Sequence, residues 1–429
     1  MIAVFDIGKT NKKLFVFDDN YKIVLEVSAH LAETVDEDGD PCEDVHALTR
    51  WIGDTFNQIV SRPDFDIRAI NFSTYGASFV HLGSDGLPAA PLYNYLKPYP
   101  EDLKAKFYET YGGEKAFASA TASPVLGSLN SGMILYLLRH RKPEIFKRIR
   151  QSLHLPQYVS SLFTQAYCSD LTSIGCHTNL WDFAAAAYHP WVAKERVEQK
   201  LAPVRHADSA IEIRVGSKLL YSGIGLHDSS SALIPYLNHA TEPFILLSTG
   251  TWCISLNPFN DKPLTSSELA QDCLCYLTYD GRPVKASRLF SGHHHEEKCR
   301  ILSGHFNVAE DTYKNVGLIE DSGIEFDSDD LSKLKSFDHA YNALIRTLIA
   351  QQIASTNLIM TPGIKAIYVD GGFSKNRIFM KLLAKAYPHL KVYAASVTQA
   401  SALGAALLIH DDWNNKPVRK DLLSLTPYS

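Results

Sequence analysis

The side chains best suited to chemistry stand near the start of the chain, in the stretch FDIGKTNKKLFVFD at positions 5–18. Two apolar, strand-like arms flank a turn that carries a carboxylate at Asp6 and a glycine at Gly8. Its remaining polar side chains include Lys9, Thr10 and Lys13. Because glycine has no Cβ, backbone N–H groups at such a tip can approach a ligand closely, and clustered N–H groups suit phosphate. The pattern therefore predicts a hairpin that holds phosphate groups.

Two further glycine-bearing turns follow predicted strands. In PFILLSTGTWCISLNP, two strands flank a turn around Gly250, which repeats the opening hairpin about midway along the chain and suggests a duplicated architecture. In VDGGFSKN, the pair Gly371 and Gly372 separates a strand from a helix. Three such turns, with hydroxyls at Thr10 and Thr251, predict a nucleoside triphosphate clamped between two domains. The motif GxxxxGKS/T does not occur, so this is not a P-loop protein.

The elements that must position these turns alternate along the chain. Strands followed by helices predict the α/β class with mixed sheets. Residues 101–164 are expected to be helical, and VTQASALGAALLIH predicts a helix whose small residues let backbones pack closely. A change of organisation past residue 221 predicts two domains, 1–222 and 223–429. The acidic segment 321–330 is expected to be a solvated linker or insertion.

The composition excludes several classes of protein. The chain has 429 residues, too many for one core, with a net charge of −5 and a pI near 6.4. This charge gives no electrostatic footprint for nucleic acid, so the expected partner is a small molecule. The sequence contains no long uncharged apolar run, so no membrane span is expected. The N-terminus lacks the pattern of a signal peptide. The seven cysteines are expected to be reduced, mostly buried thiols in a cytoplasmic protein.

Together these motifs resemble the FGGY family of carbohydrate kinases, in the actin and hexokinase superfamily. DIGKTNKK is similar to the family's phosphate hairpin, LSTGTWCISL to its second hairpin and VDGGFSKN to its adenosine motif. GLHDSSSALIPYL resembles the segment that bears the catalytic aspartate, and STYGASFVHL resembles the sugar-side segment. The GTW and HD pairs resemble the rhamnulokinase-like version. The resemblance covers nearly the whole chain and implies two ribonuclease H-like, actin-like ATPase domains with a cleft between them.

The resemblance implies the ATP-dependent phosphorylation of a sugar hydroxyl by in-line transfer, with ATP and Mg²⁺ as cofactors. Asp228 would be the general base, although an aspartate before SSSALIPYL is also suited to cap a helix. The preceding His227 would hydrogen-bond the sugar, and Gly76 would let the sugar approach the backbone. Asp6 would orient Mg²⁺ through water, because that ion keeps much of its hydration shell.

The resemblance also places a set of residues around the nucleotide: Thr10, Asn11, Lys13, Gly250, Thr251, Gly372 and Asn376. The residues of the first hairpin would contact the β- and γ-phosphates, and those of the second would stabilise the transferring phosphoryl group. Gly372 and Asn376 would contact the adenosine and the α-phosphate. Ordinary structural roles compete with these functions: a solvated strand residue for Lys13, a plain hairpin turn for Gly250, and a helix cap for Asn376.

Two departures from the family pattern stand out, and the second leaves the sugar open. Lys9 replaces the usual threonine, and RLFSGHHHEEK stands where relatives carry a more apolar helix around a glycine. The expected acceptor is a ketose, such as L-rhamnulose, L-fuculose or a pentulose. The three adjacent histidines 293–295 would point in different directions on a helix, which favours a solvated or cleft-lining helix start over a metal site.

Three alternatives to a ketose kinase are retained. The acceptor could be glycerol or another polyol. The protein could instead be a non-catalytic, actin-like nucleotide sensor, although a sensor needs no base such as Asp228. A zinc hydrolase built on the histidine run would require bound zinc. Many kinases of this family are dimers, so the resemblance also leaves a homodimer open.

Overall fold

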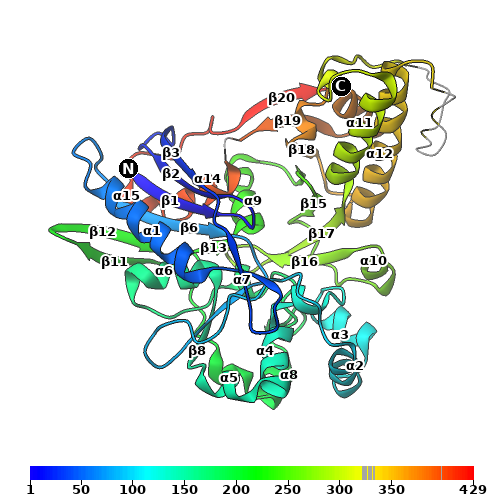
Figure 1. Cartoon of the computed structure of the whole chain (residues 1–429). Helices are drawn as coiled ribbons and strands as arrows, with labels where there is room; N and C mark the ends of the chain where they lie inside the picture. Colours follow the sequence, from blue (N-terminus) through cyan, green and yellow to red (C-terminus); the bar gives the residue numbers. More distant parts are fainter. Residues whose placement is uncertain (321–325, 327–330, 332–333, 398) are drawn as a thin grey trace.

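The computed structural model describes residues 1–320, 326, 331, 334–397 and 399–429. Two large mixed β-sheets form the two halves of the molecule, and helices pack around and between them (Figure 1). The acidic segment 321–330, expected to be a linker or insertion, lies outside the described residues except for residue 326.

The first sheet is built around the hairpin predicted from the opening residues. In spatial order its strands are β11 (Ala210–Val215), β12 (Lys218–Gly223), β6 (Ala69–Thr74), β1 (Ile2–Ile7), β2 (Lys12–Phe17) and β3 (Ile23–Ala29), with β13 (Leu226–His227) also beside β6. β1 and β2 pair antiparallel, whereas β6 lies on the other side of β1 and runs parallel to it. The inner strands are buried on both faces, which explains their nearly continuous apolar sequences.

The second sheet repeats this arrangement. In spatial order its strands are β16 (Cys273–Leu277), β17 (Pro283–Leu289), β15 (Cys253–Asn257), β14 (Phe244–Thr249), β18 (Ala366–Gly371), β19 (Lys391–Ser396) and β20 (Ser424–Tyr428). β14 and β15 form the second hairpin, and β18 runs parallel to β14 on its other side. Both sheets therefore contain an antiparallel hairpin with a parallel strand beside its first strand: β1, β2 and β6 in one, and β14, β15 and β18 in the other. This shared arrangement confirms the predicted duplication.

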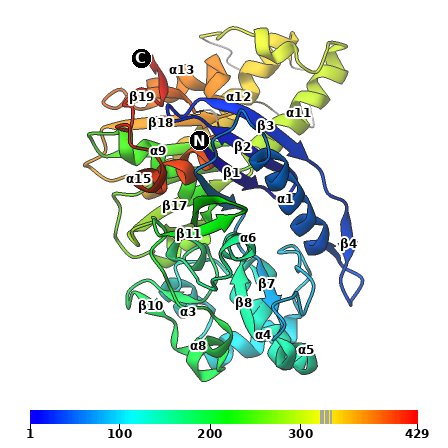
Figure 2. The same ribbon diagram turned by 90° about the vertical axis from the view of Figure 1, so that its left-hand side faces the viewer.

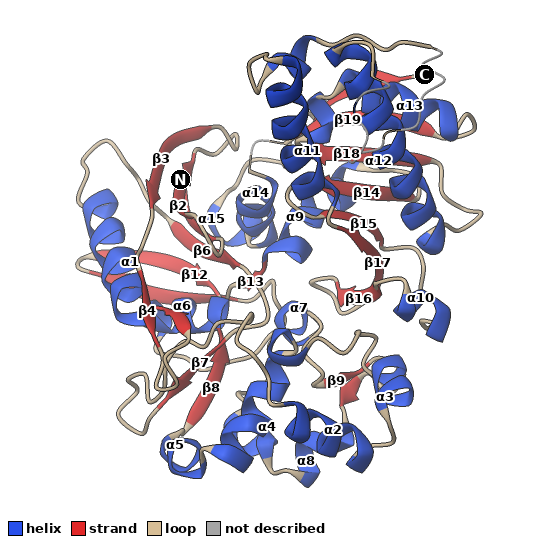
Figure 3. Cartoon of the chain, turned by 45° about the vertical axis from the view of Figure 1, so that its right-hand side comes forward, coloured by secondary structure: helices blue, strands red, loops and turns tan. Residues whose placement is uncertain are grey.

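Two helices, α9 (Asp228–His239) and α14 (Ala400–Leu408), pack against each other between the sheets (Figure 3). The small residues of α14 allow a close approach, as predicted: a Cβ on Gly404 would lie 1.9 Å from the carbonyl oxygen of Ser231 in α9. α14 also packs against β1 and β6. One apolar core therefore includes residues of both sheets, among them Val4 and Leu246.

The remaining helices cover the outer faces of the sheets and form a lobe below the first one (Figure 1). They are α1 (Val45–Val60), α2 (Glu101–Thr110), α3 (Glu114–Ala120), α4 (Ser131–Arg141), α5 (Pro143–Arg148), α6 (Leu155–Thr164), α7 (Leu171–Ile174), α8 (Pro190–Lys194), α10 (Ser266–Ala270), α11 (Ser291–Phe306), α12 (Phe337–Ile359), α13 (Arg377–Ala386) and α15 (His410–Trp413). Short 3₁₀ turns are η1 (Gly127–Leu129), η2 (Val197–Lys200), η3 (Thr312–Asn315) and η5 (Phe373–Lys375).

The helical prediction for residues 101–164 is wrong at two places, of which the first is a turn and loop at residues 121–126. β8 (Gln151–His154) interrupts the helices and pairs antiparallel with β7 (Phe79–Leu82). The conformation of this short segment is set by pairing with a strand far away in the sequence, and its own residues do not predict a strand. The other short strands are β4 (Glu33–Val35), β5 (Pro41–Glu43), β9 (Trp181–Asp182) and β10 (Ala187–Tyr188).

Three further observations bear on the expectations from the sequence. The domain division at 222/223 stays a prediction, and β13, just past it, belongs to the first sheet. No helix in the described part of the chain combines the length and apolar character needed to cross a bilayer. All seven cysteines lie in that part, and each is buried and without a disulfide, as predicted.

Candidate active site

The first hairpin presents a carboxylate and an exposed tip. Asp6 in β1 lies directly opposite Lys13 in β2, and the tip is closed by a hydrogen bond from the Gly8 N–H to the Asn11 carbonyl at 2.9 Å. Thr10 and Asn11 are exposed at this tip. The Lys13 ammonium lies 2.9 Å from Glu26 on β3. The hairpin therefore holds its expected phosphate-binding residues at a solvent-facing edge.

A buried lysine supports this tip from below. Lys12 is 2% exposed, and its ammonium donates to the carbonyls of Gly8 at 3.1 Å and Lys9 at 2.8 Å. It also pairs with Glu43, which accepts a hydrogen bond from the Tyr75 hydroxyl. The sequence reasoning missed Lys12. Because side chains alternate between the faces of a strand, the pair KK in β2 signals that one lysine must point inward.

The second hairpin and the double-glycine turn form one unit. The carbonyl of Thr249 accepts from the Gly372 N–H at 2.7 Å, and its hydroxyl accepts from the Phe373 N–H at 2.9 Å. Gly371 has φ of +87°, and a Cβ there would lie 1.9 Å from the Thr249 oxygen. Glycine is therefore required at this turn. Gly250, at the hairpin tip, is exposed.

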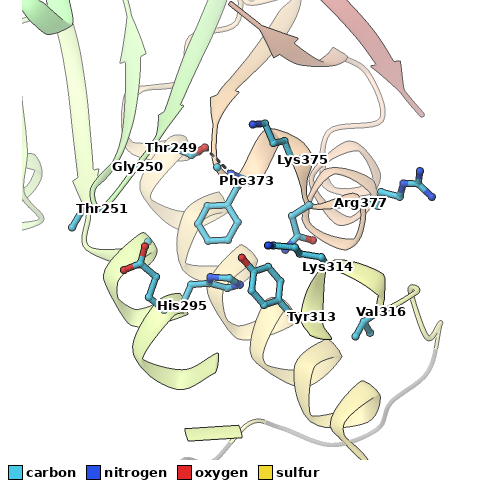
Figure 4. Close-up of a pocket in the computed structure, with 14 residues that line it drawn as sticks. Thr249, Gly250, Thr251, His295, Tyr313, Lys314, Val316, Phe373, Lys375 and Arg377 are labelled. Carbon is cyan, nitrogen blue, oxygen red and sulfur yellow. Dashed lines mark hydrogen bonds between the residues drawn. The ribbon is translucent and has the colours of Figure 1, made fainter. Parts of the chain in front are cut away.

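A cavity of about 550 Å³ opens beside these two turns (Figure 4). It is lined by Thr249, Gly250, Thr251, Gly292, His295, Glu296, Tyr313, Lys314, Val316, Gly372, Phe373, Lys375, Asn376 and Arg377. This volume falls in the usual range for small-molecule sites. It brings together the expected nucleotide residues of the second half of the chain: Gly250, Thr251, Gly372 and Asn376. Those of the first hairpin, Thr10, Asn11 and Lys13, do not line it.

Asn376 has a structural role in addition to its place in the cavity wall. Its side-chain oxygen accepts from the N–H groups of Ile378 and Phe379, each at 3.1 Å, and so caps α13. Its amide nitrogen donates to the Tyr341 hydroxyl at 2.7 Å. The competing interpretation as a helix cap is therefore correct, and it is compatible with a position beside a ligand.

Aromatic rings form one wall of the cavity. The ring of His295 lies 5.0 Å from Tyr313 and 5.2 Å from Phe373, and in Figure 4 these side chains point toward one another. Burial lowers the pKa of His295 to about 4, so the ring is neutral at physiological pH. Sequence reasoning missed Tyr313 and Lys314, because they lie in a segment without a recognisable pattern.

The histidine run does not form a metal site. His293 and His294 are exposed on α11, whereas His295 is buried against the cavity, as expected for adjacent residues on a helix. Among the described residues, one group has the spacing for a metal ion: Asp36, Asp38 and Asp40. The Lys97 ammonium lies among these carboxylates, 2.6 Å from Asp36, and neutralises part of their charge.

A second, smaller cavity of about 210 Å³ lies between α9 and the second sheet. It is lined by Asp228, Ser229, Ala232, Ser248, Ile254, Leu256 and Ser401. The hydroxyl of Ser401 donates to Asp6 at 2.9 Å. Burial, and then the negative charge of Asp228, raise the pKa of Asp6 to about 7. Asp6, the predicted metal-orienting residue, and Asp228, the predicted base, therefore lie close enough for their charges to interact.

Asp228 is the first residue of α9, and His227 precedes it at the cap position. The Asp228 carboxylate accepts from the Ser229 N–H at 2.6 Å and lies 3.1 Å from His227 Nε2. The alternative that Asp228 caps the helix is wrong, because His227 occupies the cap position and Asp228 is already inside the first turn, where the helix dipole stabilises a carboxylate. About a third of the side chain, 35%, is exposed, which leaves the carboxylate accessible to a ligand.

His227 and Gly76 pack against a residue that the sequence did not single out. His227 is buried, and its Nε2 lies 3.2 Å from the sulfur of Cys176. A Cβ on Gly76 would lie 2.4 Å from that sulfur and 2.9 Å from the His227 ring. Gly76 therefore makes room for these two side chains. The predicted sugar contacts of His227 and Gly76 stay predictions.

The two sheets, each opening on a glycine-tipped hairpin, have the architecture of the two-domain, actin-like ATPases. Models of the FGGY family match most of the chain: the N-terminal domain of the FGGY family of carbohydrate kinases at residues 1–212, and C-terminal domains of that family at residues 241–321 and 335–409. The chain belongs to the FGGY family of carbohydrate kinases. Kinases of this family are phosphotransferases.

Among characterised relatives, a rhamnulokinase of Halalkalibacterium halodurans is 24% identical over 259 residues, or 58% of this chain. The match spans 54% of that protein, about half its length. A carbohydrate kinase from Novosphingobium aromaticivorans superposes with a TM-score of 0.78 at 21% identity, covering 99% of this chain and 95% of that one. A xylulose kinase from Lactobacillus acidophilus gives a TM-score of 0.80 at 16% identity, covering 100% and 94%. These similarities in structure establish the shared fold.

Proposed function

We propose that this protein is an ATP-dependent kinase that phosphorylates a hydroxyl group of a sugar. The observation that carries the proposal is the position of β14 between two cavities. Ser248 lines the small cavity that contains Asp228, and the next residues, Thr249 to Thr251, line the large one. A nucleotide in the large cavity would thus direct its phosphates along the second hairpin toward a carboxylate. Family membership supports this assignment.

The residues of the chain supply distinct parts of the transfer. The neutral aromatic wall would take the base of ATP, and the Thr251 N–H and hydroxyl at the exposed hairpin tip would hold the transferring phosphoryl group. The Gly250 N–H donates to the Trp252 carbonyl at 2.9 Å, so Gly250 would contribute by leaving room for the phosphoryl group to approach the tip. Thr10, Asn11 and Lys13 would reach the phosphates from the first hairpin when the two halves approach each other. Such closure excludes water, which would otherwise compete with the sugar.

Asp228 would act as the base. As the sugar oxygen attacks the γ-phosphorus, the hydroxyl proton passes to the Asp228 carboxylate, and the bond between the γ-phosphorus and the leaving oxygen of ADP breaks. The carboxylate has the exposure that this step needs, and its hydrogen bonds to Ser229 and His227 orient it.

The donor set at Asp6 fits Mg²⁺. Burial and the negative charge of Asp228 disfavour the ionised form of Asp6. A divalent cation would offset this cost, and Mg²⁺ prefers oxygen ligands. Asp6 would hold the ion through water, with Ser401 fixing its carboxylate. When bound, Mg²⁺ supplies charge that offsets the phosphates.

The proposed acceptor is a ketose: L-rhamnulose, L-fuculose or a pentulose. The similarity to a rhamnulokinase favours this class, as do structural neighbours described as xylulose kinases. A polyol such as glycerol is the second candidate, because a glycerol kinase with ADP from Plasmodium falciparum shares the fold at a TM-score of 0.71. A cytoplasmic location, a homodimer, and the absence of nucleic-acid and membrane partners stay predictions.

The test follows ADP release from Mg-ATP with a panel of ketoses, gluconate and glycerol. The expected result is release that depends on one acceptor and is lost in Asp228→Asn. A matched control is Asp338→Asn, which changes an exposed carboxylate in the first turn of α12. Nucleotide binding without transfer to any acceptor would instead support the nucleotide-sensor alternative.

A further inference from the structure

Next to the proposed base lies a buried cluster of ionisable side chains with no assigned role. Cys176 is 0% exposed, and its sulfur lies 3.2 Å from Nε2 of His227 and 3.4 Å from Nε2 of His177. The same Nε2 of His227 lies 3.1 Å from Asp228. The sulfur also fills the space above Gly76, where a Cβ would clash with it at 2.4 Å. This close packing holds the thiol against the histidine.

The hydrogen-bond partners of His227 define its protonation. A carboxylate only accepts, so Nε2 must carry a proton to bond with Asp228. On the other side of the ring, Nδ1 lies 3.5 Å from the Ser230 hydroxyl. That hydroxyl donates its only proton to the Leu277 carbonyl at 2.8 Å, so toward His227 it can only accept. These two neighbours favour a proton on each ring nitrogen, which is the imidazolium form of His227.

We propose that Cys176 and His227 form a buried thiolate–imidazolium pair that positions the Asp228 carboxylate. In this arrangement the Nε2–H of His227 is shared between the sulfur and the carboxylate. Because Cys176 is fully buried, it does not reach a substrate, and it acts through His227. Cys176 and His227 are thus positioning residues. Their effect on catalysis rests on the proposed function, whereas the charged pair itself does not.

The electrostatic environment agrees with this geometry. Burial alone would raise the pKa of the Cys176 thiol, but His177 and His227 lower it below its ordinary value. Burial alone would lower the pKa of His227, but Cys176 and Asp228 raise it well above its ordinary value. Other ionisable groups near the pair are His154, Tyr276 and Arg288.

A second cysteine–histidine contact in the same chain provides an internal contrast. Cys299 lies 3.4 Å from Nε2 of His295, but that nitrogen faces the Tyr341 hydroxyl at 2.9 Å instead of a carboxylate. Here burial raises the pKa of the thiol to about 12 and lowers the pKa of the histidine to about 4. This second pair is therefore neutral. It lacks the second histidine that Cys176 has in His177 and the carboxylate that His227 has in Asp228.

The first test is a pH titration of the ultraviolet absorbance of thiolate in the intact protein. Burial raises the pKa of every other thiol: Cys42, Cys168, Cys253, Cys273, Cys275 and Cys299. An ordinary free thiol is still mostly protonated below about pH 8, because its pKa lies above that pH. Thiolate detected below about pH 8 would therefore come from Cys176. We expect about one thiolate per chain in the wild type and in the buried control Cys168→Ser, and none in Cys176→Ser. A wild-type protein without thiolate absorbance there would overturn the pair.

A second measurement needs no variant and protects the test against misfolding of Cys176→Ser. Nitrogen chemical shifts of labelled histidines distinguish imidazolium from neutral imidazole, and His295 serves as the neutral reference. We expect His227 to remain an imidazolium at about pH 8, well above the ordinary pKa of histidine. A neutral His227 at that pH would contradict the proposal, whatever the kinase assay shows.

The catalytic consequence is tested by steady-state kinetics. Cys176→Ser should lower kcat by about tenfold to a hundredfold, the cost of losing a group that orients a reacting residue, with KM for ATP unchanged. The loss should depend on pH, because the histidine then loses its proton more readily. An unchanged kcat and pH profile in a variant that has lost the thiolate would refute the positioning role. Absence of kinase activity in the wild type would refute only the proposed function, since both spectroscopic results would stand.

Discussion

The hydroxyl of Ser401 donates a hydrogen bond to Asp6 at 2.9 Å, across 395 positions of the chain. Ser401 lies at the start of α14, and Asp6 lies in β1, on which that helix packs. The two ends of the chain also meet elsewhere, since the N-terminus lies beside α15 in both views (Figure 1 and Figure 2). The position of the first carboxylate is therefore set by a residue near the other end of the sequence.

Removing this hydroxyl should weaken the response to Mg²⁺. In Ser401→Ala, Asp6 loses a donor that favours its ionised form. We expect the Mg²⁺ concentration at half-maximal activity to rise about tenfold, since a hydrogen bond to a charged group contributes ~1.5 kcal/mol or more. The measurement is ADP release against Mg²⁺ at saturating acceptor. Thr110→Ala, which removes an exposed helical hydroxyl, should leave the curve unchanged. Equal curves for Ser401→Ala and the wild type would contradict the role of Ser401.

The stability of the metal-free protein should fall as the pH rises. Burial raises the pKa of Asp6 to about 7 in the folded state, so the folded chain binds an extra proton between about pH 4 and pH 7. The free energy of unfolding therefore decreases across this window, by at most about 4 kcal/mol because Asp6 is only partly buried. Chemical denaturation in the presence of a chelator measures this change. Asp6→Asn should flatten the profile, and an equal slope in the two proteins would rule out Asp6 as its source.

Lys12 should matter for stability more than Lys13, although the two are adjacent. Lys12→Met leaves Glu43 buried without its cation, which should cost about 3–5 kcal/mol, and the released carbonyls should loosen the hairpin tip. Lys13→Met removes an exposed ion pair with Glu26 and should cost less than about 1 kcal/mol. Denaturation curves of both variants check this order. Adding Glu43→Gln to Lys12→Met should recover part of the loss, and similar losses for the two lysines would disprove the assignment.

Two helical glycines should respond to alanine in opposite ways. A Cβ at Gly404 would lie 1.9 Å from the Ser231 backbone, so Gly404→Ala must push α14 away from α9. We expect a loss of more than about 2 kcal/mol, within the range for overpacked cores, together with reduced activity. Gly304 in α11 has open space around it, and Gly304→Ala should stabilise the protein by up to about 1 kcal/mol. Thermal unfolding of both variants tests this contrast, and a tolerated Gly404→Ala would show that the helices can separate freely.

Much of the fold followed from local patterns. The apolar arms around Gly8 and Gly250 predicted two hairpins, and both lie at equivalent places in two sheets of the same strand arrangement. The small residues of α14 predicted its close packing. These features are readable because glycine tips and continuous apolar strands determine backbone conformation within a few residues. The strand β8 was missed, because its pairing with β7 depends on a partner about 70 residues earlier.

The sequence by itself determined which chemical groups the site contains: two carboxylates, two glycine-tipped hairpins and a capping asparagine at Asn376. Only the tertiary structure decided their partners. It turned Lys12 inward beneath the hairpin tip, joined Ser401 to Asp6, and packed Cys176 against His227. The physical reason is that side-chain partners are selected by strand register and helix packing between distant segments, which no local pattern encodes.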